Sequence, residues 1–306
     1  MREPTDILHI APAIAQGAPA PEVLPETRRD IGRLIEGQPE EALRCLDAVL
    51  SGPEVKRAFE WLEAIGALGV WLPEVQALVG FHLSSPVHHK DLWTHTLEVL
   101  ERTPNEPDLR WVALLHDVGK VATRCLLESK QVSFHGHERL GAWLSEGIGA
   151  RFAMNAPRRA RIAFIIEHHA RINAYEAQWT DRAIRRLIRD SGEHLEDMLR
   201  FSSADYTTKR PRRAKRIRAQ LEELNIRIEG VKEELRRRPS LPPRLGKQLC
   251  ADLGLSPGPD IGLSLAWLEE QIASERLLSN QEPSYYIGAL EKVKPWASEG
   301  LSAQKG

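Results

Sequence analysis

The sequence lacks most of the features that would assign it at once to a class of protein. Its three cysteines, Cys45, Cys125 and Cys250, lie far apart and form no Cys-x-x-Cys pair, which argues against a disulfide framework and a thiolate zinc site. No run approaches about 18 consecutive apolar residues, and the start has no charged segment followed by an apolar one, so we expect a soluble, cytoplasmic protein with no membrane partner. The formal net charge of the 306 residues is -1, so charge indicates no partner, and the oligomeric state stays open.

Alternation of polar and apolar residues, the pattern typical of β-strands, is also missing. Apolar residues recur instead at helical spacing, and the sequence therefore predicts an all-α fold. The run at 70–74, Val-Trp-Leu-Pro-Glu, breaks this helical pattern. The predicted helices cover residues 40–50, 54–65, 90–102, 108–117, 135–148, 157–170, 180–190, 194–206 and 263–278.

The chain is expected to have four segments. Residues 1–38 are rich in Ala and Pro with little periodic hydrophobicity, which predicts a flexible N-terminal arm. A helical lead-in follows over 39–85, then the domain with the chemically informative residues over 86–211, then basic and amphipathic helices with a C-terminal helical element over 212–306. Within this last segment, apolar residues from 217 to 235 repeat at alternating steps of four and three, which predicts one long helix that packs inside this chain rather than in a dimer coiled coil.

The run Leu-Leu-His-Asp-Val-Gly-Lys at 114–120 is the most informative part of the sequence. Its adjacent His116 and Asp117 can both ligate one cation, and Gly119 allows close backbone approach at the helix end. Four further residues with metal-ligating side chains lie in the helices around it: His95, His137, His169 and Asp205. The set predicts a site for a divalent metal cation, with Mg, Mn, Ni, Fe and Zn all left open.

Helical phase places these outlying residues on apolar faces. His169 follows three isoleucines at offsets of three, four and seven, and Asp205 follows Met198 and Phe201 at seven and four. For any single histidine, such as His95, a core position satisfied by backbone hydrogen bonds is the competing interpretation. A buried carboxylate without a cation partner is costly. The six together therefore favour a metal site built from several helices.

The segment 209–218 is the most basic in the sequence. A solvated helix face is one interpretation of such a run. The other is a patch that contacts phosphate groups without reading bases, because it starts four residues after Asp205 and because the predicted helix 180–190 carries a second basic face. The expected RNA or phosphate contacts are Arg212, Arg213 and Arg216. Since these charges lie beyond the proposed ligands, we expect a long polyanion to reach them and a mononucleotide not to.

The segment from Pro86 to about Pro211 resembles the HD-superfamily metal-dependent phosphohydrolases, and specifically the HD domain of bacterial tRNA nucleotidyltransferases, the CCA-adding enzymes. The matching stretches include His-His-Lys-Asp-Leu-Trp-Thr-His-Thr at 88–96, residues 109–120, Thr-Arg at 123–124, His-Gly-His-Glu at 135–138, Glu-His-His at 167–169 and Ala-Asp-Tyr-Thr-Thr-Lys-Arg-Pro at 204–211. A weaker match extends over roughly residues 40–280. The resemblance implies an HD-domain helical bundle with flanking helical segments.

One departure from those enzymes bears on the function. Their transferase activity needs a Gly-rich phosphate loop and an Asp-x-Asp pair that binds two magnesium ions, and residues 1–90 contain neither. We therefore expect a free-standing HD hydrolase that kept the body of such an enzyme without its polymerising head.

The expected chemistry is phosphoester hydrolysis. Four residues are expected to hold the cation: His95, His116, Asp117 and Asp205. The cation would lower the pKa of a water molecule toward about 7 for attack on phosphorus. His137 and His169 would either bind a second ion or act as general acids, which the sequence leaves open. Lys120 and Arg124 closely follow the His-Asp pair and are expected to neutralise charge on the phosphoryl oxygens, with surface solvation as the alternative.

The substrate class comes from the resemblance. It implies a 2′,3′-cyclic phosphate, a 2′-nucleotide or an RNA end, with tRNA as a possible partner. Two alternatives stay open: a hydrolase of dNTPs or signalling nucleotides unrelated to RNA, and a catalytically silent body that binds tRNA or another RNA.

Overall fold

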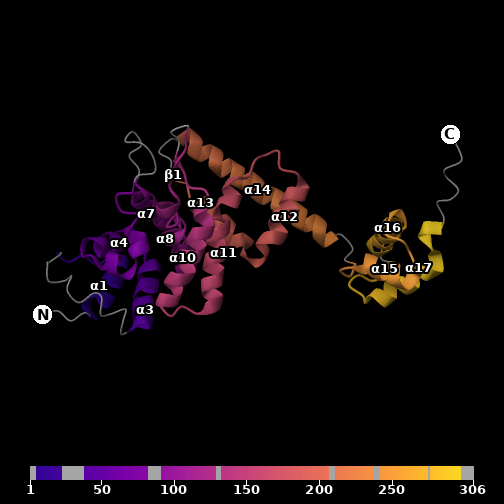
Figure 1. The fold of residues 1–306 in the computed structure, drawn as a ribbon, viewed down its shortest axis with the longest axis horizontal. Coiled ribbons are helices and arrows are strands. Elements are labelled where there is room, and N and C mark those ends of the chain that lie inside the picture. Colours follow the sequence, from indigo (N-terminus) through magenta and orange to yellow (C-terminus); the bar gives the residue numbers. More distant parts are fainter. Residues whose placement is uncertain are drawn as a thin grey trace. The chain divides into compact units, whose positions relative to one another are not determined.

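Helices make up nearly all the regular structure in the computed structural model of the chain (Figure 1), so the predicted all-α fold is confirmed. Two compact units, residues 1–225 and 226–306, divide within one long helix, and each is described by itself. The structure describes residues 5–22, 38–81, 91–128, 132–206, 211–237, 241–274 and 276–297. Parts of the segments predicted above lie outside these ranges, namely residues 1–4, 23–37, 82–90, 129–131, 207–210, 238–240, 275 and 298–306.

The first helices of unit 1 correct the prediction of a flexible arm. Residues Thr5–Ala15 form helix α1, which packs on α3 (Pro39–Leu50) and α4 (Val55–Ala64). Ile7, Ala11 and Ile14 are buried, and their spacing of four and three places them on one helix face. The Ala and Pro content of this segment obscured that short apolar stripe. Sequence composition therefore underestimated how much of the arm packs.

The predicted break at residues 70–74 is also partly wrong. Two short helices, α5 (Ala67–Trp71) and α6 (Pro73–Gln76), lie there with only Leu72 between them. Pro73 occupies the first turn of α6, where its missing N–H costs no hydrogen bond. Trp71 and Leu72 are both buried, so the chain turns at this point without leaving the core.

The helices of the central domain follow the predicted ones within a few residues. Side-chain caps explain several starts: Asp91 accepts from Thr94 N at 2.7 Å, and Asn155 accepts from Arg158 N at 3.0 Å. In chain order these helices are α7 (Leu92–Arg102), α8 (Pro107–Leu115), α9 (Lys120–Thr123), α10 (His137–Arg151), α11 (Ala156–Asn173), α12 (Asp181–Ser191), the 3-10 turn η2 (Gly192–His194) and α13 (Leu195–Ala204).

A small β-hairpin interrupts the helices between α9 and α10. Strands β1 (Cys125–Leu126) and β2 (Val132–Ser133) pair antiparallel, with Cys125 opposite Ser133. The sequence analysis found no strand, because a strand of two residues is too short to show alternation. The hairpin leaves the all-α class unchanged.

Helix α11 lies at the centre of unit 1, in contact with α8, α10 and α13 (Figure 1). Ile162, Ile165 and Ile166 of α11 are buried, as their spacing predicts. The first turn of α11 carries Arg158, which pairs with Asp47 of α3 at 2.7 Å and with Asp108 of α8 at 2.6 Å. Apolar packing and these ion pairs therefore hold the same helices together.

Helix α14 (Pro211–Arg237) begins in unit 1 and continues into unit 2. Leu224, Ile228 and Val231 of its predicted apolar seam are buried, so this part of the seam packs inside the chain as predicted. The basic residues of its first turns are exposed. The predicted boundary at 211/212 thus coincides with the start of α14, whereas unit 1 extends to Asn225.

Unit 2 contains three further helices, α15 (Leu245–Leu253), α16 (Pro259–Ala273) and α17 (Pro283–Val293), followed by the turn η3 (Pro295–Ala297). Its core includes Leu249, Leu268, Tyr286 and Leu290. The helix predicted over 263–278 starts earlier and ends at Ala273, and α17 was not predicted. Only two core residues mark the buried face of α17, Tyr286 and Leu290, too few for a clear periodic signal. Within the described part of the chain, no helix is both long and apolar enough to cross a membrane.

Candidate metal centre

The structure brings all six predicted ligand residues together in unit 1. They come from five helices or helix ends: His95 on α7, His116 and Asp117 just after α8, His137 at the start of α10, His169 on α11 and Asp205 just after α13. His116, Asp117 and His169 are buried, and the side chains of His95, His137 and Asp205 are only 11 to 13% exposed. The inward helical phase read from the sequence is confirmed for His169.

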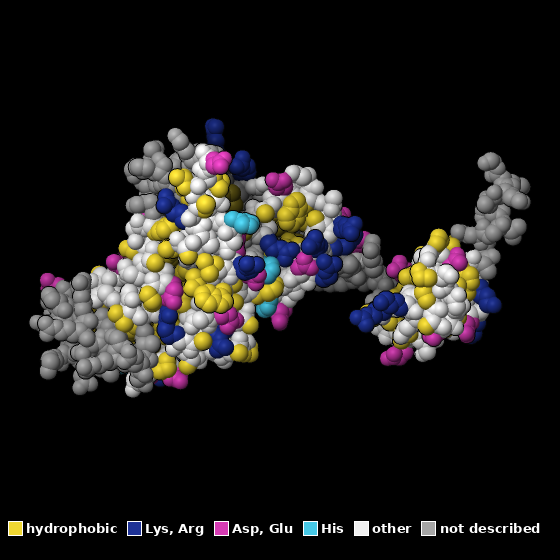
Figure 2. All heavy atoms as spheres, viewed as in Figure 1, with side chains coloured by type: hydrophobic (Ala, Val, Ile, Leu, Met, Phe, Trp, Pro, Cys, Tyr) yellow, Lys and Arg dark blue, Asp and Glu magenta, His cyan; other side chains and the backbone are white. Residues whose placement is uncertain are grey.

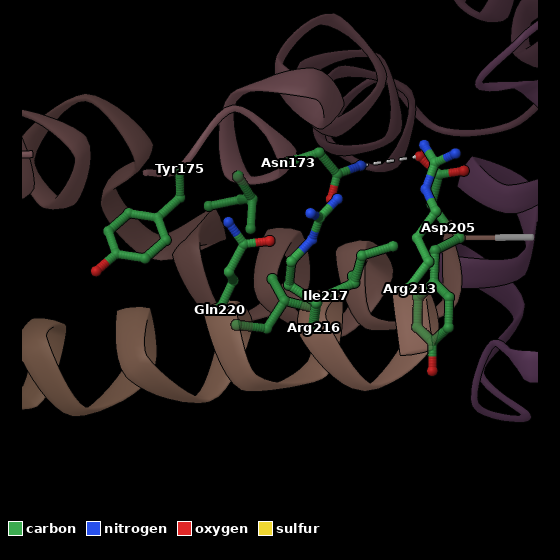
Figure 3. Close-up of a pocket in the computed structure, with 10 residues that line it drawn as sticks. Asn173, Tyr175, Asp205, Arg213, Arg216, Ile217 and Gln220 are labelled. Atoms are coloured by element: carbon green, nitrogen blue, oxygen red, sulfur yellow. Dashed lines mark hydrogen bonds between the residues drawn. The ribbon is translucent and has the colours of Figure 1, made fainter. Parts of the chain in front are cut away.

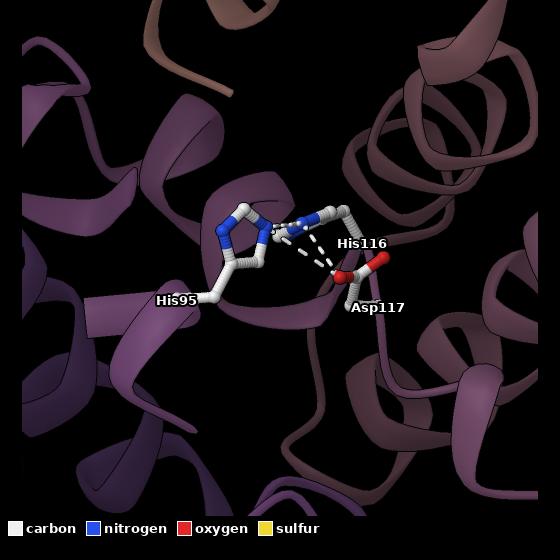
Figure 4. Close-up of side chains that lie close together, drawn as sticks. All are labelled: His95, His116 and Asp117. Carbon is white, nitrogen blue, oxygen red and sulfur yellow. Dashed lines mark hydrogen bonds and ion pairs between the residues drawn. The ribbon is translucent and has the colours of Figure 1, made fainter. Parts of the chain in front are cut away.

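Four of these residues form a tight cluster, of which Figure 4 shows His95, His116 and Asp117. His95 Nε2 lies 3.2 Å from His116 Nε2, 3.5 Å from Asp117 Oδ2 and 3.3 Å from Asp205 Oδ1. His116 Nε2 lies 3.3 Å from Asp117 Oδ2 and 3.6 Å from Asp205 Oδ1. Ligand bonds of about 2.1 Å separate neighbouring donor atoms by about 3.0 to 3.4 Å. Three of the five observed distances fall in this range and the other two exceed it by no more than 0.2 Å, so these atoms are placed to surround one cation.

Backbone carbonyls orient three of the histidines. The Nδ1 atoms of His116, His137 and His169 lie 2.9, 2.9 and 2.6 Å from carbonyl oxygens three residues earlier in the chain. A carbonyl oxygen only accepts, so Nδ1 carries the proton and donates it. In the neutral form of each ring, Nε2 then presents its lone pair to the centre, which is the tautomer that a metal ligand needs.

A second group of possible ligands shares Asp117 with the first. Donor atoms of Asp117, His137 and His169 lie within 4.8 Å of one another, and His137 Nε2 lies 3.8 Å from Asp117 Oδ1. Within the described residues, the buried Nε2 of His137 has no hydrogen-bond partner. A buried nitrogen without a partner is costly, and a cation would relieve that cost. The donor sets could hold one ion or two, and Asp117 is common to both sets.

The electrostatics of the cluster favour anionic carboxylates. Burial raises the pKa of Asp117, but His116 and Lys120 lower it more, and the pKa lies well below its ordinary value. Burial likewise raises the pKa of Asp205, and His116 together with a hydrogen bond from His95 brings it below the ordinary value. Both carboxylates are therefore ionised at neutral pH and available to a cation.

The two predicted cationic residues lie in different surroundings. Lys120 Nζ lies 2.7 Å from Asp117 Oδ1 and donates a hydrogen bond to Oδ2 at 2.8 Å. Arg124 lies over the ring of Phe81, 6.0 Å from its centroid, and among the described residues it forms no ion pair with the six candidate ligands. The structure thus brings Lys120 to the cluster and leaves Arg124 outside it.

Gly119 allows the close approach that its place in the motif predicts. A Cβ atom there would lie 2.2 Å from the carbonyl oxygen of His137 and 2.8 Å from the amide nitrogen of Gly141. Any side chain would therefore push α10 away. The glycine keeps the first turn of α10, and with it His137, beside Asp117.

Asn173 was missed by the sequence analysis. It is the last residue of α11 and donates from Nδ2 to Asp205 Oδ2 at 3.2 Å. This bond holds one carboxylate oxygen and leaves Oδ1 facing His95. A signal was present, because Asn173 follows His169 by four residues and so shares its helix face.

A cavity of about 450 Å³ opens beside Asp205 (Figure 3). It lies between the end of α11 and the first turns of α14. Arg213 and Arg216 line it, whereas Arg212 does not. Asp205 lines the same cavity, so two of the three arginines share it with a candidate ligand. The expectation that a mononucleotide does not reach them stays a prediction. Figure 2 shows Lys and Arg side chains gathered beside histidines on this face of unit 1.

Comparisons with known proteins agree with this arrangement. Residues 92–223 match the family model of the HD domain. The chain is 33% identical over 263 residues to the A-adding tRNA nucleotidyltransferase of Deinococcus radiodurans, a match that covers 83% of this chain and 57% of the relative. It is 31% identical over 281 residues to the CC-adding tRNA nucleotidyltransferase of Thermus thermophilus, covering 85% of this chain and 61% of the relative.

A shorter match joins the chain to the multifunctional CCA protein of Methylococcus capsulatus, with 36% identity over 170 residues, 51% of this chain and 39% of the relative. The chain thus spans about six tenths of the length of the first two relatives. The predicted resemblance is confirmed: the chain contains an HD domain and is homologous, over most of its length, to bacterial tRNA nucleotidyltransferases.

Proposed function

We propose that this protein is a metal-dependent phosphohydrolase. The observation that carries the proposal is the cluster of His95, His116, Asp117 and Asp205, in which the two histidine Nε2 atoms lie 3.2 Å from each other and 3.3 to 3.6 Å from one oxygen of each carboxylate. Imidazole nitrogens and carboxylate oxygens suit several divalent ions, so the identity of the metal stays open among Mg, Mn, Ni, Fe and Zn. HD domains as a class support the proposal, since they bind divalent metals and hydrolyse phosphoesters.

A divalent cation held by these four residues would supply the Lewis acidity that brings the pKa of a water molecule near neutrality. Asp117 and Asp205 balance the charge of the ion, and Asn173 holds Asp205 in place through its hydrogen bond. Lys120 is anchored on Asp117, where its ammonium is available to a phosphoryl oxygen.

His137 and His169 are proposed as ligands of a second ion rather than as general acids. Burial lowers the pKa of both, helped by the charge of Lys120 for His137 and of His116 for His169. A histidine with a lowered pKa is neutral at pH 7 and has no proton to spare on Nε2. The neutral imidazole is the form that ligates a metal.

The proposed substrate is a nucleotide or RNA phosphoester, such as a 2′,3′-cyclic phosphate, a 2′-nucleotide or an RNA end. The names of the relatives support an RNA-related substrate, with tRNA as the proposed partner. Arg212, Arg213 and Arg216 are the proposed phosphate contacts. A cytoplasmic location stays a prediction.

The second candidate function is an RNA-binding body without catalysis. The exposed arginines of α14 favour it, because phosphate contacts alone suffice for binding. The two functions differ in one property: only the hydrolase needs an occupied metal cluster for its effect on a phosphoester.

The decisive test is metal-dependent turnover. Protein purified without chelator is assayed for bound metals by mass spectrometry and for phosphate release or ring opening over a nucleotide panel. We expect a transition metal or added Mg²⁺ or Mn²⁺ to support turnover, chelation to remove it, and readdition of the metal to restore it. Stoichiometric RNA binding with no turnover under any metal would reject the hydrolase and favour the binding body.

A further inference from the structure

The cavity beside Asp205 contains two arginines, Arg213 and Arg216. Figure 3 shows the side chains of Arg213 and Arg216 reaching from α14 toward Asn173 and Asp205. Among the described residues, neither guanidinium forms an ion pair. A guanidinium that lines a cavity without an anionic partner is a ready site for phosphate or carboxylate.

Several other arginines of unit 1 form ion pairs with carboxylates of neighbouring elements. Arg158 pairs with Asp47 and Asp108, Arg161 with Asp197, and Arg171 with Asp190. The carboxylate of Asp205 faces the histidine cluster through Oδ1 and is held by Asn173 through Oδ2. The cavity therefore offers positive charge that its own carboxylate does not use.

The rest of the lining suits the remainder of a nucleotide. Ile172, Ile217 and Leu221 supply apolar surface, and Gln220 supplies an amide. The volume of about 450 Å³ lies in the range of small-ligand pockets, about 300 to 1,000 Å³. A single nucleotide unit fits this space, whereas a folded RNA helix does not.

We propose that the cavity binds the nucleoside of the substrate together with a second phosphate, held by Arg213 and Arg216. This inference rests on the proposed function, in which the reacting phosphate lies at the cation cluster. Asp205 belongs to both the cation cluster and the cavity lining, so the two sites adjoin. One nucleoside can therefore carry a phosphate at the cluster and a second phosphate at the arginines. The preferred substrate class is then a nucleotide with phosphates on both sides of its ribose, as at the end of an RNA chain, rather than a nucleoside with one phosphate.

Equilibrium binding tests this with matched probes. Adenosine 3′,5′-bisphosphate, adenosine 3′-monophosphate and ADP are titrated by calorimetry into the full chain in the presence of Mn²⁺. We expect the bisphosphate to bind at least about tenfold more tightly than the monophosphate, because charge-assisted hydrogen bonds to the second phosphate are among the strong ones. ADP carries both phosphates on one side of the ribose and is expected to bind less tightly than the bisphosphate.

Three variants assign the effect to the cavity. Arg213→Gln and Arg216→Gln should each reduce the preference for the bisphosphate by about three- to tenfold, while Arg218→Gln, at an exposed arginine of α14 that does not line the cavity, should keep it. All three side chains are exposed, so unchanged thermal melting is expected and confirms folding. Equal affinities for the bisphosphate and the monophosphate, or an equal loss in all three variants, would overturn the inference. Tighter binding of ADP than of the bisphosphate would also overturn the arrangement across the ribose.

Turnover of 2′,3′-cyclic AMP, measured in parallel, separates the two proposals. Turnover without a preference for the bisphosphate would reject the second phosphate site and leave the hydrolase intact. An arginine-dependent preference without turnover under any metal would support the nucleotide site and reject the hydrolase.

Discussion

Two regions of unit 1 use charged side chains in opposite ways. Between α3, α8, α11 and α13, arginines meet carboxylates: Arg158 bonds to Asp47 and Asp108, and Arg161 bonds to Asp197. We call this the paired region. Around the cation cluster and the cavity, carboxylates meet histidine nitrogens, and the cavity arginines form no ion pair with any residue that the structure describes. We call this the open region.

The difference teaches which charges hold the fold and which serve a ligand. In the paired region each charged group has its partner within the ion pair, and the pair holds two helices together. In the open region, His137 Nε2 lacks a partner among the described residues, and Arg213 and Arg216 form no ion pair there. The buried nitrogen is costly unless something binds it, whereas the exposed guanidinium groups are solvated and open to an anion. Changes in the open region should therefore affect chemistry and binding, and changes in the paired region should affect stability.

The largest expected effect is on turnover in the open region. Asp117→Ala should reduce phosphoester hydrolysis by more than about 100-fold, because Asp117 belongs to both ligand groups and loss of even a supporting residue costs about 10- to 100-fold. Circular dichroism should show a folded protein. Asp252→Ala, an exposed carboxylate on α15, is the control and should leave turnover unchanged. Full activity in Asp117→Ala would contradict the claim that the open region carries the chemistry.

The next effect is on stability in the paired region. Arg158→Ala leaves Asp47 and Asp108 without this partner and should lower the free energy of unfolding by about 2 to 3 kcal/mol, measured by urea denaturation. Turnover per folded molecule should stay the same. Arg139→Ala removes an exposed arginine of α10 that forms no ion pair among the described residues and should change stability by less than about 0.5 kcal/mol. A similar loss in both variants would show that the ion pairs contribute nothing.

Two adjacent histidines test where the open region ends. His169 is buried with Nε2 toward the cluster, whereas His168 stacks on Phe164 with ring centroids 4.3 Å apart. His169→Ala should lower turnover at least about tenfold, and His168→Ala should lower it less than about threefold. Bound metal, measured in both variants, should fall only in His169→Ala. A dominant effect of His168 would contradict the orientation of α11.

The salt dependence of RNA binding tests which arginines of α14 contact phosphates. If the basic face contacts RNA phosphates, replacing Arg212, Arg213 and Arg216 together should flatten the slope of log affinity against log salt by up to about three units, and Arg212→Gln alone by about one. Fluorescence anisotropy with tRNA measures the slope. Arg212→Gln should leave hydrolysis of a small nucleotide unchanged, since it lies outside the cavity. An unchanged slope in the triple variant would show that the basic face of α14 is solvated and does not contact RNA phosphates.

The smallest effect concerns cysteine reactivity and leaves function untouched. Burial raises the pKa of Cys45 to about 12, and its Sγ points to Ile7 O of α1 at 4.0 Å. Cys125 on β1 is exposed. Iodoacetamide at pH 8 should modify Cys125 and leave Cys45 intact in native protein, because only the thiolate reacts. Mass spectrometry of the peptides measures both sites, and Cys125→Ser is the control. Labelling of Cys45 at the rate of Cys125 would show that α1 does not cover α3.

The sequence predicted the parts of the fold that depend on periodicity. The apolar stripe of α11 and the position of His169 follow from spacings of three and four, because a helix of 3.6 residues per turn places such residues on one face. Features without a long period were missed. Helix α1 has only a short stripe within an Ala- and Pro-rich segment, and the hairpin strands have two residues each.

The six candidate ligand residues were identified from the sequence by residue type and order, and so was the HD resemblance, because both depend on the local run His116-Asp117 and its neighbours. The sequence alone could not predict the distances between side chains of different helices. His95 lies 3.3 Å from Asp205 although 110 positions separate them in the sequence, and Asn173 holds Asp205 through a hydrogen bond. Arg213 lines the same cavity as Asp205, whereas Arg212 does not. All three features depend on how the helices pack. Periodicity determines which way a side chain faces within its own helix, whereas only tertiary packing determines which side chain of another helix it meets.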